Sequence, residues 1–326
     1  MKRRDFIRLF FGGTALGWPL IASGQQSRKM PRVGVLVAES APHPFTEAFR
    51  VGMHELGYSE GQNVVIEWRY ADALFTRAVE LATGLVGVGV GVDVIAAHHT
   101  PAVKAAMSVT RTIPIVMSPA GAPLETGLVT SLAHPGGNVT GLSSMEAELG
   151  GKRIDLLREV IPGLARVAVL GSKSDPFTRP FVQDIQIAAE RTQLQLQPVL
   201  VDGPSEFDGA FAAMSAAGAQ AVMVQPLFSP QTSIIVKFAA KHHLAIMSSY
   251  RDTTQAGGLI SYSADHAAYF KRAAIFVDKI LKGAKPTELP VEQPTKFELI
   301  INLKAAKALG LDVPLHLQQQ ADEVIE

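Results

Sequence analysis

The sequence contains no cysteine among its 326 residues. Disulfide bonds, thiolate metal sites, a cysteine nucleophile and a lipid-anchoring cysteine are therefore excluded. Neither sign of charge predominates, because 30 lysines and arginines balance 30 aspartates and glutamates. Nucleic-acid-binding proteins normally carry a basic patch, so the balance gives no support to nucleic acid as a partner. Beyond the N-terminal segment no apolar run is long enough to span a bilayer, and the mature protein is expected to be soluble.

The first 24 residues have the composition of an export signal. A basic start is followed by the mostly apolar stretch 9–21 and by the small residues Ala22-Ser23-Gly24. This order predicts a signal peptide over residues 1–24, cleavage near Gln25, and a periplasmic protein without a lipid anchor. The run Arg3-Arg4-Asp5-Phe6-Ile7-Arg8 resembles a twin-arginine signal, and an ordinary basic segment for general secretion is the alternative.

The rest of the chain is long enough for two domains, and 47% of the whole sequence is hydrophobic. Short apolar runs alternate with amphipathic helical patterns at the spacing of βαβ units, which predicts parallel, doubly wound sheets. Strands are expected at 32–38, 64–70, 93–97 and 113–117, and the alternation restarts at 167–170, 197–201, 221–224 and 245–248. A restart of this kind is typical of two α/β lobes.

Three breaks in the pattern predict three chain crossings between the lobes. They are the turn cluster 133–138, the glycine-containing run 255–258 and the proline-rich run 289–294. Between the last two, a strand at 259–262 and a helix that Asp265 caps are expected to return to the first lobe. The predicted domains are therefore 31–141 plus 257–290 for the first lobe, and 142–256 plus 291–326 for the second.

A resemblance to a known family rests on the C-terminal third. The runs Val277-Asp278-Lys279-Ile280-Leu281-Lys282-Gly283-Ala284-Lys285-Pro286 and Leu289-Pro290-Val291-Glu292-Gln293-Pro294-Thr295-Lys296-Phe297-Glu298-Leu299 are its most specific parts, with the ending 321–326. These runs closely resemble the ABC-transporter substrate-binding family related to tryptophan-binding proteins. The resemblance extends from about Pro31 to the C-terminus. It implies a type I periplasmic binding protein, with two α/β lobes, a three-crossing hinge and a ligand in the cleft.

The resemblance also implies the function. A protein of this kind captures a small molecule and delivers it to a membrane ABC permease. Here the small molecule is expected to be an amino acid or a similar organic acid, and an aromatic one is the narrower expectation. It is expected to act as a monomer, without cofactor or catalysis. Two alternatives stay open: a sensor that presents its closed state to a receptor, and a secreted α/β enzyme. The family often has an acidic residue where this chain has Ala120-Gly121-Ala122, so the ligand's identity stays open too.

The candidate binding residues come from a rule of topology: in open α/β sheets, ligands bind outside the carboxyl ends of the strands. The residues at the expected strand ends, rich in hydroxyl and aromatic groups, are Ser40, Thr100, Ser118, Gly121, Ser172, Asp175, Gln225, Tyr250 and Tyr262. The helix that starts at Thr100 offers backbone N–H groups that suit a carboxylate, and Asp175 suits an ammonium group. Tyr250 and Thr100 are expected to face each other across the cleft.

Other motifs are interpreted as structural. The glycines from Gly87 to Gly91 precede a strand rather than open a helix, so they do not form a dinucleotide-binding loop. The adjacent pairs His98-His99 and His242-His243 lack the i, i+4 spacing of helical metal ligands, and no metal site is expected. No serine lies in a Gly-x-Ser-x-Gly elbow, and no catalytic residue is predicted.

Overall fold

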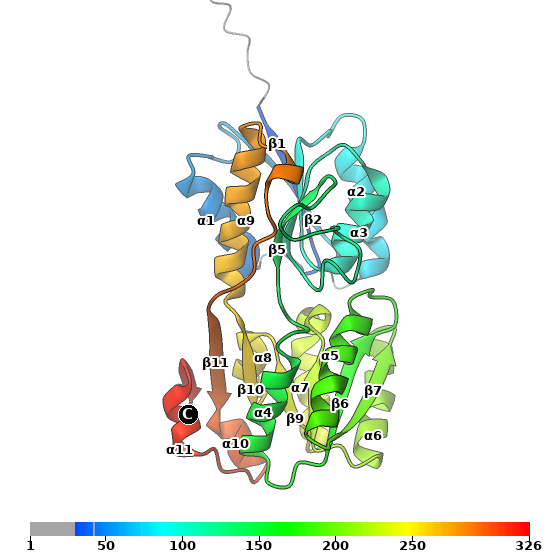
Figure 1. Ribbon diagram of the computed structural model, residues 1–326, viewed down its shortest axis with the longest axis vertical. Helices are drawn as coiled ribbons and strands as arrows, with labels where there is room; N and C mark the ends of the chain where they lie inside the picture. Colours follow the sequence, from blue (N-terminus) through cyan, green and yellow to red (C-terminus); the bar gives the residue numbers. More distant parts are fainter. Residues whose placement is uncertain (1–29, 42, 73) are drawn as a thin grey trace, which may run out of the picture. The chain divides into compact units, whose positions relative to one another are not determined.

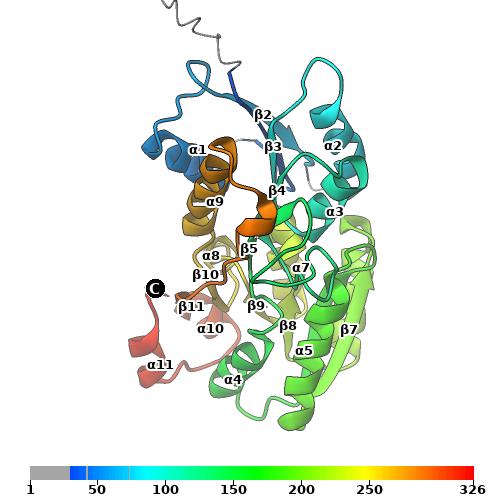
Figure 2. The same ribbon diagram turned by 45° about the horizontal axis from the view of Figure 1, so that its top comes forward.

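A computed structural model describes residues 30–41, 43–72 and 74–326 of the protein. The predicted signal peptide, residues 1–24, lies outside this range. From Pro31 onward the described chain forms two α/β lobes, each built on its own sheet (Figures 1 and 2). In the described part of the chain, no helix combines the length and apolar character that a membrane span requires.

The first lobe contains a five-stranded parallel sheet in the order β2-β1-β3-β4-β5. Its strands are β1 Arg32–Val37, β2 Val65–Tyr70, β3 Val94–Ala97, β4 Ile115–Ala120 and β5 Val139–Ser143. Helices α1 Pro44–Glu55 and α9 His266–Leu281 pack against each other on one face, while α2 Ala78–Val86 and α3 Thr100–Val109 cover the other. Because both faces are covered, every residue of β3 and β4 is buried, and these strands are mostly apolar.

The second lobe contains seven strands in the order β12-β11-β10-β9-β8-β6-β7. They are β6 Arg166–Ser172, β7 Gln195–Val201, β8 Ala221–Val224, β9 Ala245–Ser248, β10 Ile260–Ala264, β11 Phe297–Asn302 and β12 Glu323–Ile325. Pairing is parallel except between β10 and β11. The helices are α4 Gly150–Val160, α5 Thr178–Arg191, α6 Phe207–Ala216, α7 Thr232–Lys241, α8 Arg251–Gln255, α10 Leu303–Ala308 and α11 Leu315–Gln320. Short 3₁₀ turns occur at Phe75–Arg77, Pro204–Glu206, Pro226–Gln231 and Pro286–Glu288.

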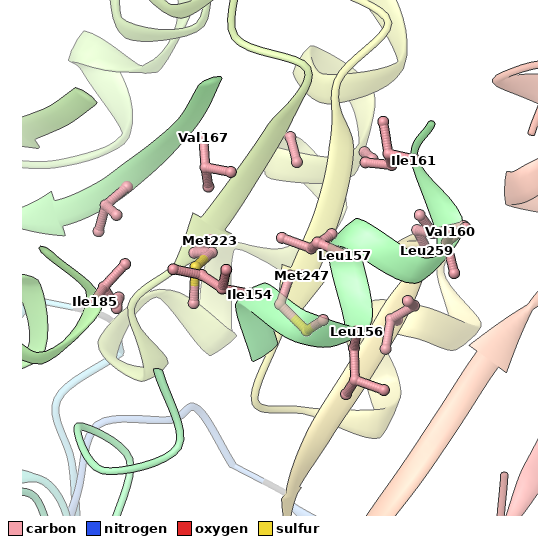
Figure 3. Close-up of a cluster of buried hydrophobic side chains, with 14 of the residues drawn as sticks. Ile154, Leu156, Leu157, Val160, Ile161, Val167, Ile185, Met223, Met247 and Leu259 are labelled. Carbon is pink, nitrogen blue, oxygen red and sulfur yellow. The ribbon is translucent and has the colours of Figure 1, made fainter. Parts of the chain in front are cut away.

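The core of the second lobe lies on both faces of its sheet. Helix α4 supplies much of one face, where Figure 3 shows Ile154 and Leu157 directed toward Met223 and Met247. Helices α6 and α7 close the other face around Phe207. Burial of such side chains contributes about 1.5–3 kcal/mol each relative to exposure. The apolar stripe of α4 therefore fixes that helix on the sheet.

Two predictions about the crossings are wrong. The sequence predicts the first crossing at 133–138, but β5 follows this turn and pairs with β4 in the first lobe, so the chain crosses after Ser143. The sequence also predicts that the strand at 259–262 belongs to the first lobe, but β10 pairs with β9 and along its whole length with β11 in the second. The glycines at 257–258 only end helix α8, since the Gly258 N–H donates to the Thr253 carbonyl. The chain crosses later, at Asp265, whose carboxylate accepts the Ala268 N–H and caps α9.

The other two crossings run beside each other. Leu142 at the end of β5 forms a bridge with Glu292 of the proline-rich run, and the Ser143 N–H donates to the Glu292 carbonyl at 2.9 Å. Arg272 of α9 holds the Glu292 carboxylate with two hydrogen bonds of 2.7 and 2.8 Å. The connections between the lobes are thus joined by both backbone and side-chain bonds.

Candidate functional site

A small cavity lies between the lobes, at the carboxyl ends of β3, β4 and β9. Its lining residues come from both lobes and are His98, His99, Thr100, Pro119, Ala120, Gly121, Ser144, Glu146, Asp175, Phe177, Pro226, Tyr250 and His266. The cavity volume is about 10 Å³, enough for a single water molecule at most. Four of the nine predicted binding residues, Thr100, Gly121, Asp175 and Tyr250, are brought together here.

Tyr250 forms an aromatic wall of this cavity. Its ring stacks on His266 at a centroid distance of 4.3 Å, and its hydroxyl lies 3.5 Å from the His99 Nε2. The ring of Phe45 packs 5.8 Å from it. Burial raises the pKa of Tyr250 well above its ordinary value, so the phenol is neutral and its hydroxyl can donate. An aromatic ring with a polar tip suits a ligand that has an apolar body.

Gly121 allows the two lobes to approach closely. A Cβ at this position would lie 2.5 Å from ring atoms of Phe177, which belongs to the second lobe. Real Cβ atoms do not approach so closely, so a larger residue would force the Phe177 ring to move. The hydroxyl of Thr100 holds the backbone of Gly121 in place, since it donates to the Gly121 carbonyl at 3.1 Å and accepts the Gly121 N–H at 3.3 Å.

Asp175 is positioned by a buried set of hydrogen bonds. One carboxylate oxygen accepts the Phe177 N–H at 2.9 Å, and the other accepts the Gln225 Nε2 at 2.7 Å. The Gln225 Oε1 in turn accepts the Ser172 N–H at 2.8 Å and the Thr178 hydroxyl at 2.9 Å. Burial raises the pKa of Asp175 to about 6. Ser172 and Gln225 therefore lie behind the cavity and hold Asp175 in place.

The remaining three predicted residues lie elsewhere. Ser40 is exposed beyond the end of β1, and Ser118 is buried with its hydroxyl 3.5 Å from the Val116 carbonyl. The ring of Tyr262 packs against Phe297 at 5.9 Å in the second lobe. Tyr262 contributes only its carbonyl to the surroundings of the cavity, as an acceptor for Arg153.

Sequence reasoning missed a buried ion pair beside the cavity. Arg153 of α4 and Glu146 are 2% and 1% exposed, and the Arg153 Nη2 lies 2.6 Å from a Glu146 carboxylate oxygen. The Ser249 hydroxyl donates to the same carboxylate, and the guanidinium also donates to the Tyr262 carbonyl at 2.9 and 2.7 Å. The pair thus connects the first crossing to the strand that leads into the second. A signal did exist, because Arg153 falls in the apolar stripe of its helix between Gly150 and Leu157.

A second group was also missed, on the first-lobe side. Glu39 follows β1, and its carboxylate lies 3.2 Å from the Nδ1 of His98, which follows β3. The rings of His98 and His99 stack at 3.8 Å. Burial lowers the pKa of His98 to about 3, and burial also lowers the pKa of His266, so both rings are neutral at neutral pH.

A larger cavity of about 170 Å³ adjoins the first and shares Tyr250 and His266 with it. Phe45, Ser261 and Ser263 contribute to its wall, together with the charged residues Arg251 and Glu298. Arg251 forms ion pairs with Glu298 and with Glu323 of β12. Tyr250 and His266 therefore belong to the walls of both cavities.

The sequence and the fold of this chain are similar to those of known proteins. A sequence profile of the ABC transporter substrate binding protein family matches residues 32–325. The chain is 25% identical over 292 residues to the tyrosine-binding protein of Clostridioides difficile (strain R20291), covering 87% of this chain and 82% of that one.

Solved structures agree with the sequence match. The ABC domain from Streptococcus pneumoniae in complex with L-Trp superposes with a TM-score of 0.85 at 25% identity, over 91% of this chain and 100% of that one. A conserved domain protein from Vibrio cholerae shares the fold, with a TM-score of 0.84 at 24% identity and the same coverage. The predicted fold, two type I periplasmic binding protein lobes, is confirmed. Because the profile spans nearly the whole described chain, the protein belongs to the ABC transporter substrate binding protein family.

Proposed function

We propose that this protein is the periplasmic solute-binding component of an ABC importer, and that it captures an amino acid or similar organic acid with an aromatic body. The observation that carries the proposal is the cavity between the lobes, where the start of a helix, a buried carboxylate and a tyrosine ring meet. Relatives named for tyrosine and solved with L-Trp, both 25% identical, support the aromatic amino acid as ligand. The protein would act as a monomer, without chemistry, and would deliver its ligand to a membrane permease.

The polar ends of such a ligand have partners at the cavity. Its carboxylate would lie at the N-terminus of α3, where the helix dipole favours negative charge. The Val103 N–H already donates to the His99 carbonyl, so the Ala102 N–H is the donor we assign to the ligand. Its ammonium group would lie against Asp175, whose pKa of about 6 leaves it ionised at neutral pH.

Capture requires movement, because a cavity of about 10 Å³ cannot hold an amino acid. We propose that the moving bodies are residues 31–143 with 265–290 and residues 144–264 with 291–326, connected by the three crossings. A ligand that contacts both bodies favours the closed state, and the permease would recognise that state. Displacement of Tyr250 toward the cavity of about 170 Å³ would make room for the aromatic body.

Replacement of Tyr250 by alanine is expected to weaken ligand binding about tenfold or more, or about 1.4 kcal/mol. The reason is that the ring would cover the apolar body of the ligand. A thermal-shift screen of aromatic amino acids and small carboxylates identifies the ligand, since binding to the native state alone raises the unfolding temperature. Calorimetry then measures the affinity of each variant.

Tyr262→Ala is the matched control, because this tyrosine lies outside both cavities. Its affinity should equal that of the unmodified protein. If no compound in the screen shifts the unfolding temperature, the proposed ligand class is wrong. If Tyr250→Ala binds as tightly as the control, the ring only packs the hinge.

Export belongs to the same proposal. The protein isolated from the periplasm is expected to begin near Gln25, because residues 1–24 have the basic, apolar and small-residue order of a signal peptide. Intact-mass measurement decides the point. A mass that includes the first 24 residues would contradict cleavage and favour a membrane tether.

A further inference from the structure

Three side chains that suit a metal ion converge at the first-lobe side of the cavity, and two of them, His98 and His99, also line it. Strands β1 and β3 are parallel neighbours, paired at Leu36 and Ala97. Their carboxyl ends therefore place Glu39 beside His98 and His99. Each residue offers one possible ligand atom, and these three atoms lie within 4.8 Å of one another. All three residues are buried.

The backbone brings the two histidines to the same side. Adjacent residues share no face of a helix, which is why the sequence predicts no metal site here, and in an extended strand they also point to opposite faces. At His99, however, φ is 67° and ψ is 153°, a conformation that residues other than glycine rarely adopt. The alternation is broken there, and the two imidazole rings stack at 3.8 Å. Adjacency in the chain therefore does not separate the two rings.

A buried carboxylate oxygen without a hydrogen bond is the independent observation. Glu39 is 2% exposed, and its Oε1 has no hydrogen-bond partner among the described residues. This oxygen instead faces two imidazole nitrogens, at 3.2 Å from the His98 Nδ1 and 3.8 Å from the His99 Nε2. A buried carboxylate oxygen that accepts no hydrogen bond is costly, and a cation between these three atoms would be bound by all of them.

We infer that Glu39, His98 and His99 form a binding site for a divalent first-row transition-metal cation such as Zn²⁺. Two imidazole nitrogens and one carboxylate are a ligand set that zinc uses where a further position stays open. Imidazole does not suit Mg²⁺ or Ca²⁺, which prefer oxygen. Because His98 and His99 also line the cavity, the open position would face the space between the lobes. The inference does not depend on the identity of the organic ligand.

The test uses the full mature chain without a polyhistidine tag, freed of metal by a chelator. Titration with ZnCl₂ in a calorimeter is expected to show a single ion per chain and a rise in unfolding temperature, whereas MgCl₂ gives neither. Co²⁺ in place of Zn²⁺ should give the visible absorption of a site with low coordination number. Absence of zinc binding to the unmodified protein would overturn the inference.

The variants separate this site from adventitious histidine binding. Glu39→Gln and His99→Asn are each expected to weaken Zn²⁺ binding about tenfold or more, equivalent to about 1.4 kcal/mol. Asparagine tolerates positive φ better than most residues, which keeps the His99 variant folded. The matched control is His242→Asn with His243→Asn, an adjacent pair beyond α7 in which His243 also has a positive φ of 51°, and it should bind Zn²⁺ unchanged. Equal affinity in folded Glu39→Gln and His99→Asn, or loss of binding in the control, would refute the site.

Discussion

Replacement of Arg153 by methionine is expected to lower the free energy of unfolding by about 3–5 kcal/mol. The change removes the guanidinium that pairs with the buried Glu146 carboxylate at 2.6 Å and that donates twice to the Tyr262 carbonyl. Methionine is long and apolar, so it fills most of the space that the arginine side chain occupies in the apolar stripe of α4. What remains is an unpaired charge in the interior and a half-buried carbonyl that has lost this donor. Urea-induced unfolding measures the difference.

Two further variants identify the cause. Adding Glu146→Gln to the methionine variant removes the unpaired charge, so the double variant should be more stable than Arg153→Met alone. Arg272→Met breaks the exposed pair with Glu292, where both side chains are more than a third open to solvent, and should cost about 1 kcal/mol or less. If Arg153→Met costs no more than Arg272→Met, the buried pair does not stabilise the fold.

The pattern of apolar runs predicts most of the sheet structure because burial on both faces leaves a clear record in the sequence. The expected strands at 32–38 and 221–224 correspond to β1 and β8, and the helix that Asp265 caps is α9. Strand β10 shows the limit of such reasoning. Its five residues are compatible with either sheet, and only the pairing with β9 and β11 decides. The glycines at 257–258 are compatible with the end of a helix as well as with a crossing between the lobes.

For the site, the topology of the sheets predicts which strand ends meet but not which side chains contact one another. Thr100, Asp175 and Tyr250 line one cavity because every parallel strand directs its carboxyl end to the same edge, and their role in binding stays a prediction. That rule cannot tell a residue at the cavity from one behind it, as Gln225 shows. The convergence of Glu39 with His98 depends on which strands become neighbours, so no spacing in the sequence encodes it. For Arg153 the apolar stripe of α4 indicates burial, but it does not identify Glu146 as the partner.

A second expected result concerns pH and Asp175. Burial raises the pKa of this carboxyl from 3.8 to about 6, against the opposing effects of the Phe177 N–H, His99 and Gln225. Between these two values the folded protein holds a proton that the unfolded chain has released. The stability that this group contributes is therefore fully present below pH 3.8 and is lost as the pH rises through 6. The loss amounts to about 2–3 kcal/mol between roughly pH 4 and pH 7.5.

The effect is measured as a difference between the unmodified protein and Asp175→Asn, so that other titrating groups cancel. With the asparagine oxygen accepting the Phe177 N–H, its NH₂ group would face the Gln225 Nε2, and two donors that face each other add a cost that is independent of pH. Urea unfolding across the pH range should show the unmodified protein losing its advantage as the pH rises. Asp208→Asn is the control, because Lys241 lowers the pKa of this exposed carboxylate and any change should have the opposite sign. A difference that stays flat, or grows with pH, would mean that burial does not raise the pKa of Asp175. The ammonium-binding role proposed for Asp175 adds a further requirement: affinity for an amino acid should increase as the pH rises through 6, where the carboxylate forms.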